Sequence, residues 1–127
     1  MMLDMTVQTK ATGRYGERLA EEYYLSHGAR LLERNFHVQY AEVDLLFEHE
    51  GDLVAVEVKT RSVVDFVAPE ECVYWSQLRR IRRGLMTYAQ DNDLLEQSMR
   101  IDVVLIVLDV DGETVVRFEH LRSVFPG

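Results

Sequence analysis

The sequence predicts a single α/β domain in which helices cover a central sheet. Its 127 residues, of which 47% are hydrophobic and 28% charged, suit one globular domain with a buried core. The predicted elements run in the order helix, three strands, helix, strand, strand. The nearly all-apolar segment 101–109 is typical of a central strand covered on both faces. No linker, repeat or low-complexity tract divides the chain, so residues 1–127 are interpreted as one domain.

The first helix is predicted to run from about Thr12 to His27. Thr12 can cap its N-terminus, and Gly28 suits the left-handed position that often ends a helix. Residues 1–11 are expected to form a loose N-terminus. The residues that recur at helical spacing, and that should face the sheet, are Gly16, Leu19, Ala20, Tyr23 and Tyr24.

Three strands are predicted to follow, and the second and third form a hairpin. The first strand covers residues 30–36, and the hairpin turns at Glu50-Gly51, which suits a two-residue loop. Because the side chains of a strand alternate between two faces, each hairpin strand should carry one apolar and one more polar face. The apolar faces are Val43, Leu45 and Phe47, and Val54, Val56 and Val58. The opposite faces carry Glu42 and Asp44, and Ala55, Glu57 and Lys59.

The expected register of this hairpin brings two acidic side chains together. Counting back from the loop along both strands, Asp44 lies opposite Glu57, with Cβ atoms about 5 Å apart. The same register places Glu42 opposite Lys59. Two buried carboxylates that face each other are unfavourable unless a cation or a shared proton neutralises them. Hard oxygen ligands select Mg²⁺, Mn²⁺ or Ca²⁺ over zinc, and Lys59 would add a positive charge beside the metal.

The second half of the chain is predicted to contain a helix and two further strands. Residues 63–73 are expected to form a loop with a turn of helix. Ser76 is the expected N-cap of a helix that runs to about Gln90. Its sheet-facing residues are Leu78, Ile81, Leu85 and Tyr88. The turn Asp111-Gly112 then separates the central strand from a last strand at 114–118.

The charge of the chain limits how it could bind nucleic acid. A net charge of −8 and a pI near 4.9 argue against a surface coated in basic residues. Segment 76–85 is an exception, because it holds four arginines and no acid. The candidate phosphate contacts are Arg61, Arg79, Arg80 and Arg83. The expected binding is therefore weak and salt-sensitive.

The location of the protein is predicted from its cysteine content and its N-terminus. Cys72 is the only cysteine, so an internal disulfide is impossible and a reducing cytoplasm is expected. Residues 1–5 lack the basic start and long apolar run of a secretion signal. No stretch approaches the length of a membrane helix, so no membrane association is expected.

Asp44, followed after twelve residues by Glu57-Val58-Lys59, resembles the catalytic pattern of the PD-(D/E)XK nuclease superfamily. Most of the chain resembles the YraN family, also filed as UPF0102, whose small bacterial members are assigned to the restriction-endonuclease-like fold. The motifs that carry this second resemblance are Gly13-Arg14-Tyr15-Gly16-Glu17-Arg18-Leu19-Ala20-Glu21, Asn35, Ala41-Glu42-Val43-Asp44-Leu45, Val56-Glu57-Val58-Lys59-Thr60-Arg61 and Arg100-Ile101-Asp102-Val103-Val104. The resemblance implies an αβββαβ core with a central mixed sheet flanked by helices.

The resemblance also implies a function and a set of site residues. It implies a metal-dependent nuclease that hydrolyses phosphodiester bonds, with DNA favoured over RNA and branched or damaged DNA among the candidate substrates. Asp44 and Glu57 would hold Mg²⁺ or Mn²⁺. The carbonyl of Val58 would add a ligand, and Glu17 would join directly or through water. Lys59 would position the attacking water.

Two positions depart from the family pattern. Ala41 stands where the family usually has glycine, and Gln77 stands where it often has lysine. Gln77 therefore weakens the case for a second basic residue in catalysis, although glutamine occupies the equivalent place in related nucleases. Gln77 and Glu42 are assigned supporting roles.

The same residues also have simpler interpretations. Asp44 and Glu57 could point to solvent from an open sheet face. Lys59 could form only a cross-strand ion pair with Glu42, a contact that contributes about 0.2–1 kcal/mol. Glu17 could be an ordinary exposed helical residue, and exposed arginines are common on helices.

Three classes of function stay open from the sequence. The first is a nuclease, and the second is a nucleic-acid-binding or protein-interaction module of the same fold with little or no catalysis. The third is a subunit that works only in a larger repair or recombination assembly. A protein partner and a homodimer both stay open as partners. Trp75 beside Tyr74 could stack on an unpaired base or simply pack at the helix start. Asp102 is interpreted as structural, and His120 as a surface or loop residue.

Overall fold

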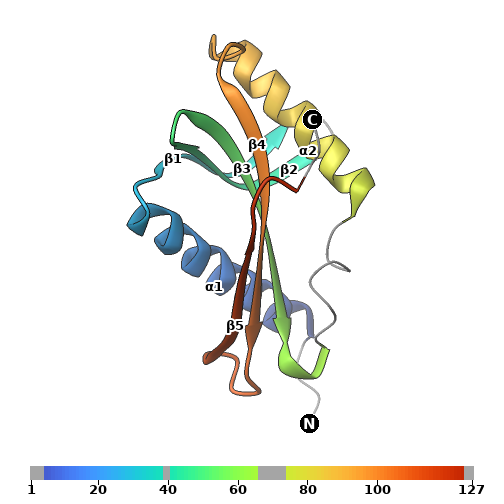
Figure 1. Cartoon of the computed structure of the whole chain (residues 1–127). Coiled ribbons are helices and arrows are strands. Elements are labelled where there is room, and N and C mark those ends of the chain that lie inside the picture. Colours follow the sequence, from blue (N-terminus) through green and yellow to red (C-terminus); the bar gives the residue numbers. More distant parts are fainter. Residues whose placement is uncertain (1–4, 39–40, 66–73, 125–127) are drawn as a thin grey trace.

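The computed structural model of the protein describes residues 5–38, 41–65 and 74–124, with side chains from residue 11 onward. Within these ranges the chain forms a five-stranded sheet with an α-helix on each face (Figure 1). The elements in chain order are α1 (Met5–Ser26), β1 (Arg30–Val38), β2 (Ala41–His49), β3 (Asp52–Ser62), the short 3-10 helix η1 (Val63–Asp65), α2 (Trp75–Asp91), β4 (Ser98–Leu108) and β5 (Val115–Leu121). The β3–β4 pair is parallel and the other pairs are antiparallel, so the predicted α/β class with a mixed sheet is confirmed.

Helix α1 starts earlier than the sequence predicts. It begins at Met5, so Thr12 lies within the helix and is not its N-cap. Residues 5–11, for which a loose start is predicted, therefore belong to the helix, whereas residues 1–4 lie outside the described part of the chain. The predicted sheet-facing stripe is confirmed, because Gly16, Ala20 and Tyr24 are buried, and Leu19 and Tyr23 pack against the same cluster.

The end of α1 agrees with its prediction. Gly28 has a φ of 88°, and its N–H donates a hydrogen bond of 3.1 Å to the carbonyl of Leu25. The N–H of Ala29 donates a second bond of 3.0 Å to the carbonyl of Tyr24. These two bonds form a Schellman cap, in which glycine takes the left-handed position at no steric cost.

The predicted hairpin is present, and its turn sets the register. Glu50 and Gly51 both have positive φ, at 53° and 81°, as a type I′ turn requires. The antiparallel pairs, counted from the turn, are His49↔Asp52, Glu48↔Leu53, Phe47↔Val54, Leu46↔Ala55 and Leu45↔Val56. The predicted register is therefore confirmed as far as Leu45 and Val56.

Strand β4 is the central strand that the sequence predicts. Residues 100–108 are all buried, because β3 and β5 flank the strand and helices cover both faces. It runs parallel to β3, so the connection must cross over, and α2 lies in that crossover. The strand covers 98–108 instead of 101–109, and β5 covers 115–121 instead of 114–118.

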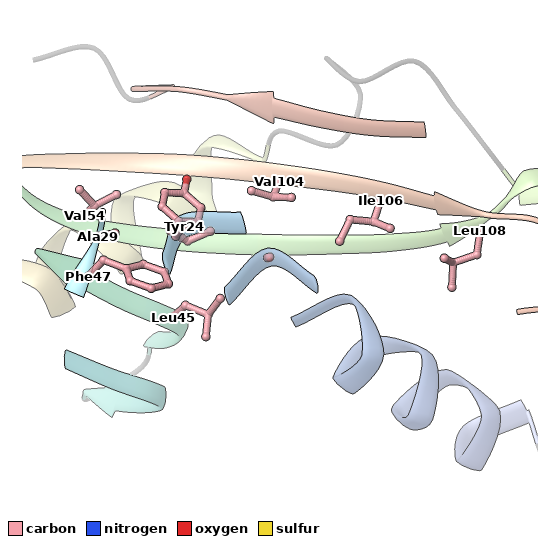
Figure 2. Close-up of a cluster of buried hydrophobic side chains, with 10 residues drawn as sticks. Tyr24, Ala29, Leu45, Phe47, Val54, Val104, Ile106 and Leu108 are labelled. Carbon is pink, nitrogen blue, oxygen red and sulfur yellow. The ribbon is translucent and has the colours of Figure 1, made fainter. Parts of the chain in front are cut away.

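The two faces of the sheet form separate cores. Figure 2 shows the core beneath α1, where Tyr24 and Phe47 stack with ring centroids 4.7 Å apart. Val54, Val104 and Ile106 complete this side of the sheet. The core beneath α2 contains Val43, Leu46, Leu53, Ala55, Leu78, Ile81, Leu85, Ala89, Ile101 and Val103. The strand order β1-β2-β3-β4-β5 places both hairpin strands, β2 and β3, inside the sheet and away from its edges.

Helix α2 follows the predicted pattern but not the predicted cap. Its N-cap residue is Tyr74, which makes no side-chain capping bond, so the prediction of Ser76 as N-cap is wrong. The helix continues through Gly84, which is buried, and a Cβ there would lie 3.5 Å from the Cβ atoms of Ala41 and Val38. The loop predicted at 63–73 contains η1, and residues 66–73, including Cys72, lie outside the described residues. Neither helix, over the part described, is long and apolar enough to cross a bilayer.

Candidate active site

Where the backbone pairing of β2 with β3 ends, the side chain of Asp44 accepts a hydrogen bond from the β3 backbone. The last backbone pair is Leu45↔Val56. Beyond it, the backbone N–H of Val58 donates a hydrogen bond of 2.8 Å to Asp44 Oδ2. The predicted ladder pair between Asp44 and Glu57 is therefore not formed, because the Asp44 carboxylate occupies the edge of β3 along which β2 would continue.

The alternation of side chains along β2 changes at Asp44. Leu45 packs in the core beneath α1, whereas Val43 packs in the core beneath α2, so the prediction that they share a face is wrong. On the neighbouring strand β1, Asn35 stands opposite Asp44, between two regular pairs, and has a positive φ of 46°. This local irregularity directs the Asp44 side chain into the plane of the sheet, toward β3, and not to either face.

Glu57, Lys59 and Gln77 form a closed set of polar contacts on the α2 side of β3. The Nε2 of Gln77 donates a hydrogen bond of 3.0 Å to Glu57 Oε1, and Lys59 Nζ lies 3.2 Å from the same oxygen. Lys59 Nζ also donates a bond of 3.1 Å to Gln77 Oε1. The predicted face for Glu57 and Lys59 is therefore confirmed. An amide suits this place because a lysine could donate to Glu57 but could not accept from Lys59.

Both carboxyl groups are held in surroundings that oppose their ionisation. Burial, followed by the charge of Glu57, raises the pKa of Asp44 to about 8, although the Val58 N–H acts in the opposite direction. Burial also raises the pKa of Glu57, which is only 7% exposed, against the lowering effects of Lys59 and Gln77. A nearby cation would relieve the cost of ionising the two groups together.

The donor atoms in this region are compatible with a hard divalent cation. Asp44 Oδ1 and Glu57 Oε2 make no hydrogen bond with the described residues, so both keep their lone pairs for a cation. The N–H and C=O of a strand residue point to the same side, so the carbonyl of Val58 faces the edge where Asp44 lies. Magnesium is often bound by one or two carboxylates together with waters and substrate phosphates.

The protein does not supply a complete metal shell from side chains alone. No three His, Cys, Asp or Glu side chains within the described ranges gather closely enough to hold a metal. A cation at Asp44 and Glu57 would therefore need the Val58 carbonyl, water or substrate oxygens as further ligands. Its presence stays a prediction.

Glu17 of α1 lies near both Asp44 of β2 and Asn35 of β1. Its charge contributes to the raised pKa of Asp44, and its Oε1 accepts a hydrogen bond of 2.8 Å from Asn35 Nδ2. Glu17 and Asn35 line a cleft of about 240 Å³ between α1 and the strands β1 and β2. Asn35 therefore connects the irregular point of β1 to the helical glutamate that the resemblance assigns to the metal shell.

The predicted supporting and basic residues are distributed unevenly around the site. Arg80 lines a cleft of about 210 Å³ together with Glu42 and Gln77, and of these three residues Gln77 contacts Lys59. The predicted ion pair between Glu42 and Lys59 is replaced, because Glu42 lies 3.7 Å from His37 on β1 and Lys59 pairs with Glu57.

The other predicted arginines make no contact with the site residues in the described part of the chain. Arg79 and Arg83 are exposed on α2. Arg61 is half-buried at the end of β3, and its guanidinium donates a hydrogen bond of 2.9 Å to the carbonyl of Thr60. Their predicted role in phosphate binding stays a prediction.

A second polar cluster surrounds Asp102, which is fully buried on β4. Its carboxylate accepts a bond of 2.6 Å from the Tyr24 hydroxyl, pairs with Arg100 at 3.0 Å and lies 2.8 Å from His120 Nε2. Although burial raises its pKa, the bonds from His120, Tyr24 and Arg100 outweigh this effect and lower the pKa to about 2. Asp102 is structural as predicted, whereas the interpretation of His120 as a simple surface residue is wrong.

The sequence does not predict the hydrogen bonds that Asn35 and Tyr24 donate to Glu17 and Asp102. Asn35 appears in the motif set and Tyr24 in the helical stripe, but neither pattern shows a polar partner. An isolated asparagine in a predicted strand is the available signal for an irregular point, because asparagine tolerates the left-handed conformation. No comparable signal in the sequence connects Tyr24 with Asp102, which is 78 residues away.

The comparison with known proteins agrees with the motifs that meet at this site. The sequence model described as "Uncharacterised protein family UPF0102" matches residues 16–106, a range that includes Glu17, Asp44, Glu57, Lys59 and Gln77. The chain belongs to the UPF0102 family. A UPF0102 protein of Syntrophomonas wolfei is 34% identical over 113 residues, which cover 89% of this chain and 96% of that protein.

Two other UPF0102 proteins show the same extent of similarity. The protein of Dictyoglomus turgidum is 34% identical over 119 residues, which cover 94% of this chain and all of its own length. The protein of Beutenbergia cavernae is 39% identical over 114 residues, which cover 90% of this chain and 95% of its own length. Similarity to the family therefore extends over the sheet and both helices.

Proposed function

We propose that this UPF0102 protein is a nuclease that uses Mg²⁺ or Mn²⁺ to hydrolyse phosphodiester bonds in DNA. The observation that carries the proposal is the pair of half-buried Asp44 and buried Glu57, both with raised pKa values, beside Lys59. The proposal includes a restriction-endonuclease-like fold of the PD-(D/E)XK superfamily, which the mixed sheet, the helix on each face and the order of elements support.

The acidic residues are assigned to metal binding. Asp44, Glu57 and the carbonyl of Val58 would hold the cation, and Glu17 would join directly or through a water held on the α1 side. Such a cation lowers the pKa of bound water and neutralises charge on the phosphate. Asn35 keeps the Glu17 carboxylate in place by its 2.8 Å hydrogen bond.

Lys59 and Gln77 are assigned to positioning. The ammonium group of Lys59 would orient the attacking water and stabilise negative charge that develops on the phosphoryl oxygens. Gln77 holds both Lys59 and Glu57 through its amide, at 3.1 Å and 3.0 Å. In the balanced reaction, water adds to phosphorus, the bond to one ester oxygen breaks, and the proton lost by the water ends on that oxygen or in solvent.

Phosphate contacts outside the site are assigned to arginines. Arg80 is placed best, because it lines the cleft beside Gln77. Arg79 and Arg83 on α2, and Arg61 on β3, would contact more distant phosphates. With a net charge of −8, the protein should bind DNA weakly and lose affinity as salt concentration rises.

Metal binding can be tested by thermal unfolding. Mg²⁺ or Mn²⁺ should raise the melting temperature of the wild type, because a ligand that binds only the folded state stabilises it. The rise should disappear in Asp44→Ala and persist in Asp91→Asn, which changes an exposed acid at the end of α2. A wild type whose melting temperature does not respond to either metal would remove this mechanism.

Cleavage is tested on linear, branched and single-stranded DNA. With Mn²⁺, the wild type should nick at least one of these substrates, and Asp44→Ala and Glu57→Ala should not. Asp91→Asn should retain the activity of the wild type. Cleavage that survives in both alanine variants would assign the activity to another site or to a contaminant.

A binding module without catalysis is the second candidate function. The observation that favours it is the absence of three closely gathered metal-ligating side chains within the described ranges. In that case DNA binding should survive in Glu57→Ala, and neither this variant nor the wild type should cleave any substrate.

A further inference from the structure

Two consecutive aromatic residues, Tyr74 and Trp75, lie at the start of α2, and Tyr74 contacts the candidate site. Tyr74 is 52% exposed and Trp75 is 50% exposed, although large aromatic residues are usually more deeply buried. The Tyr74 ring centroid lies 5.3 Å from Lys59 Nζ. Tyr74 therefore adjoins the proposed reaction centre, and Trp75, the next residue of the chain, exposes half of its surface at the start of the same helix.

Cationic side chains continue from this aromatic pair along the helix. Arg79 lies one helical turn after Trp75, at the spacing where side chains are neighbours on a helix surface. Arg80 lines the cleft beside Gln77, which in turn contacts Lys59. A strand whose phosphate reaches Lys59 would thus have arginines for adjoining phosphates and aromatic rings for a base.

We propose that the site acts on DNA in which a nucleotide next to the scissile phosphate is unpaired, and that Trp75 and Tyr74 stack on its base. This inference rests on the proposed function for the position of the phosphate. A nucleotide carries its base within a side chain's reach of its phosphate, so a phosphate at Lys59 brings the base to the ring of Tyr74. Stacking needs no particular base, because every base offers an aromatic face.

The requirement for an unpaired base follows from energetics. In a regular duplex the base is stacked and paired, and taking it out of the stack costs a few kcal/mol. This cost is smallest for a base that is already unpaired. A chain with a net charge of −8 gains little general attraction to DNA with which to offset that cost. The expected substrates are therefore single strands, flaps, gaps and mismatched positions, and not continuous duplex.

The single tryptophan makes the inference directly measurable. Trp75 is the only tryptophan of the chain, so fluorescence excited at the long-wavelength edge, where tyrosine does not absorb, reports on this position alone. In metal-free buffer at low salt, a short oligothymidylate should quench the fluorescence, and a blunt duplex of equal length should quench it much less. Equal quenching by both DNAs would overturn the inference.

Variants separate stacking from general attraction. By anisotropy of the labelled oligothymidylate, Trp75→Leu should bind about 5- to 150-fold more weakly, the range expected for loss of one base stack. Trp75→Phe should retain most of the affinity, because its ring can still stack. Met86→Ala, an exposed apolar residue on the same helix, should bind like the wild type. Unchanged affinity in Trp75→Leu would also overturn the inference.

Cleavage assays with Mn²⁺ distinguish this inference from the proposed function. If the wild type cleaves flaps but not duplex, and Trp75→Leu loses that preference, both are supported. If the wild type cleaves flaps and duplex equally, and Trp75→Leu behaves in the same way, the proposed nuclease function is supported but the base-stacking inference is overturned. If quenching and binding depend on Trp75 but the wild type cleaves no DNA, the binding of an unpaired base is supported and the proposed hydrolysis is overturned.

Discussion

At the scale of single residues, Asp44 experiences two opposing influences. Its Oδ2 accepts the N–H of Val58, a contact that favours the ionised carboxylate. Burial and the neighbouring Glu57 favour the neutral acid more strongly, and the pKa rises to about 8. The free energy of the folded protein therefore depends on whether a proton or a cation accompanies this carboxyl group.

The pH dependence of stability should reveal this group. An ordinary aspartate has a pKa of 3.8, so between about pH 4 and 8 the folded state holds a proton on Asp44 that the unfolded state lacks. Its contribution to stability is fully present below that window and is lost as pH rises through it, by at most about 1.4 kcal/mol per pH unit. The free energy of unfolding, measured with urea, should therefore fall more steeply with rising pH across this window in the wild type than in Asp44→Asn.

Other groups also change stability with pH, so the comparison is a difference between two proteins. Asp102 acts in the opposite direction, because its lowered pKa gives stability that is lost only as pH falls toward 2. This contribution is common to the wild type and Asp44→Asn, and it cancels in the difference. Identical pH profiles for the two proteins would show that Asp44 titrates normally.

At the scale of elements, the position of α1 depends on its close approach to β3. A Cβ added at Gly16 would collide with the side chain of Thr60, whose Oγ1 is buried without a hydrogen-bond partner among the described residues. Thr60 is β-branched and follows Lys59 directly, so it cannot move away easily. The helix thus lies against β3 at the level of the candidate site, which places Glu17 near Asp44.

Gly16→Ala should therefore destabilise the fold, although alanine is the better helix former. The overpacked contact with Thr60 should cost about 1–3 kcal/mol in urea unfolding. The matched control is Gly13→Ala one turn earlier in α1, where a Cβ meets nothing within 4 Å. That change should be neutral or stabilise the protein by up to about 1 kcal/mol. Equal effects of the two changes would contradict the close packing.

At the scale of the whole molecule, the Asp102 cluster ties distant segments together. Asp102 on β4 accepts bonds from Tyr24 of α1, and from the backbone N–H of Ser123 after β5. Arg100 extends the cluster to Asp52 at the start of β3 through an ion pair of 3.3 Å. These contacts join the C-terminal part of α1 and the segment after β5 to strands β3 and β4 inside the sheet.

Removing the central acid should weaken the whole fold and not one element. Asp102→Ala leaves the Arg100 guanidinium buried without its main partner, a change that typically costs about 3–5 kcal/mol. Urea unfolding should show this loss as one cooperative transition. As a control, Glu119→Ala disrupts an exposed pair with Arg117 and should cost less than about 1 kcal/mol. A loss below 1 kcal/mol in Asp102→Ala would show that the cluster contributes little.

Much of the fold could be predicted because its signals are local. The Glu50-Gly51 turn sets the hairpin register, Gly28 ends α1, and the apolar run of β4 indicates a central strand. The start of α1 and the cap of α2 could not be predicted from residue type. Thr12 and Ser76 are both good capping residues, yet the helices begin at Met5 and Trp75. A good capping residue can also lie inside a helix, so residue type alone does not fix where a helix begins.

The candidate site divides in the same way. The sequence by itself determined that Asp44, Glu57 and Lys59 lie near the same end of one hairpin, because a two-residue turn fixes how far each residue lies from it along its strand. Only the tertiary structure decided that Asp44 binds the Val58 N–H, that Gln77 joins Glu57 to Lys59, and that Asn35 holds Glu17. Those contacts depend on a change of face in β2 and on how closely each helix packs, and such non-local packing has no signature in neighbouring residues.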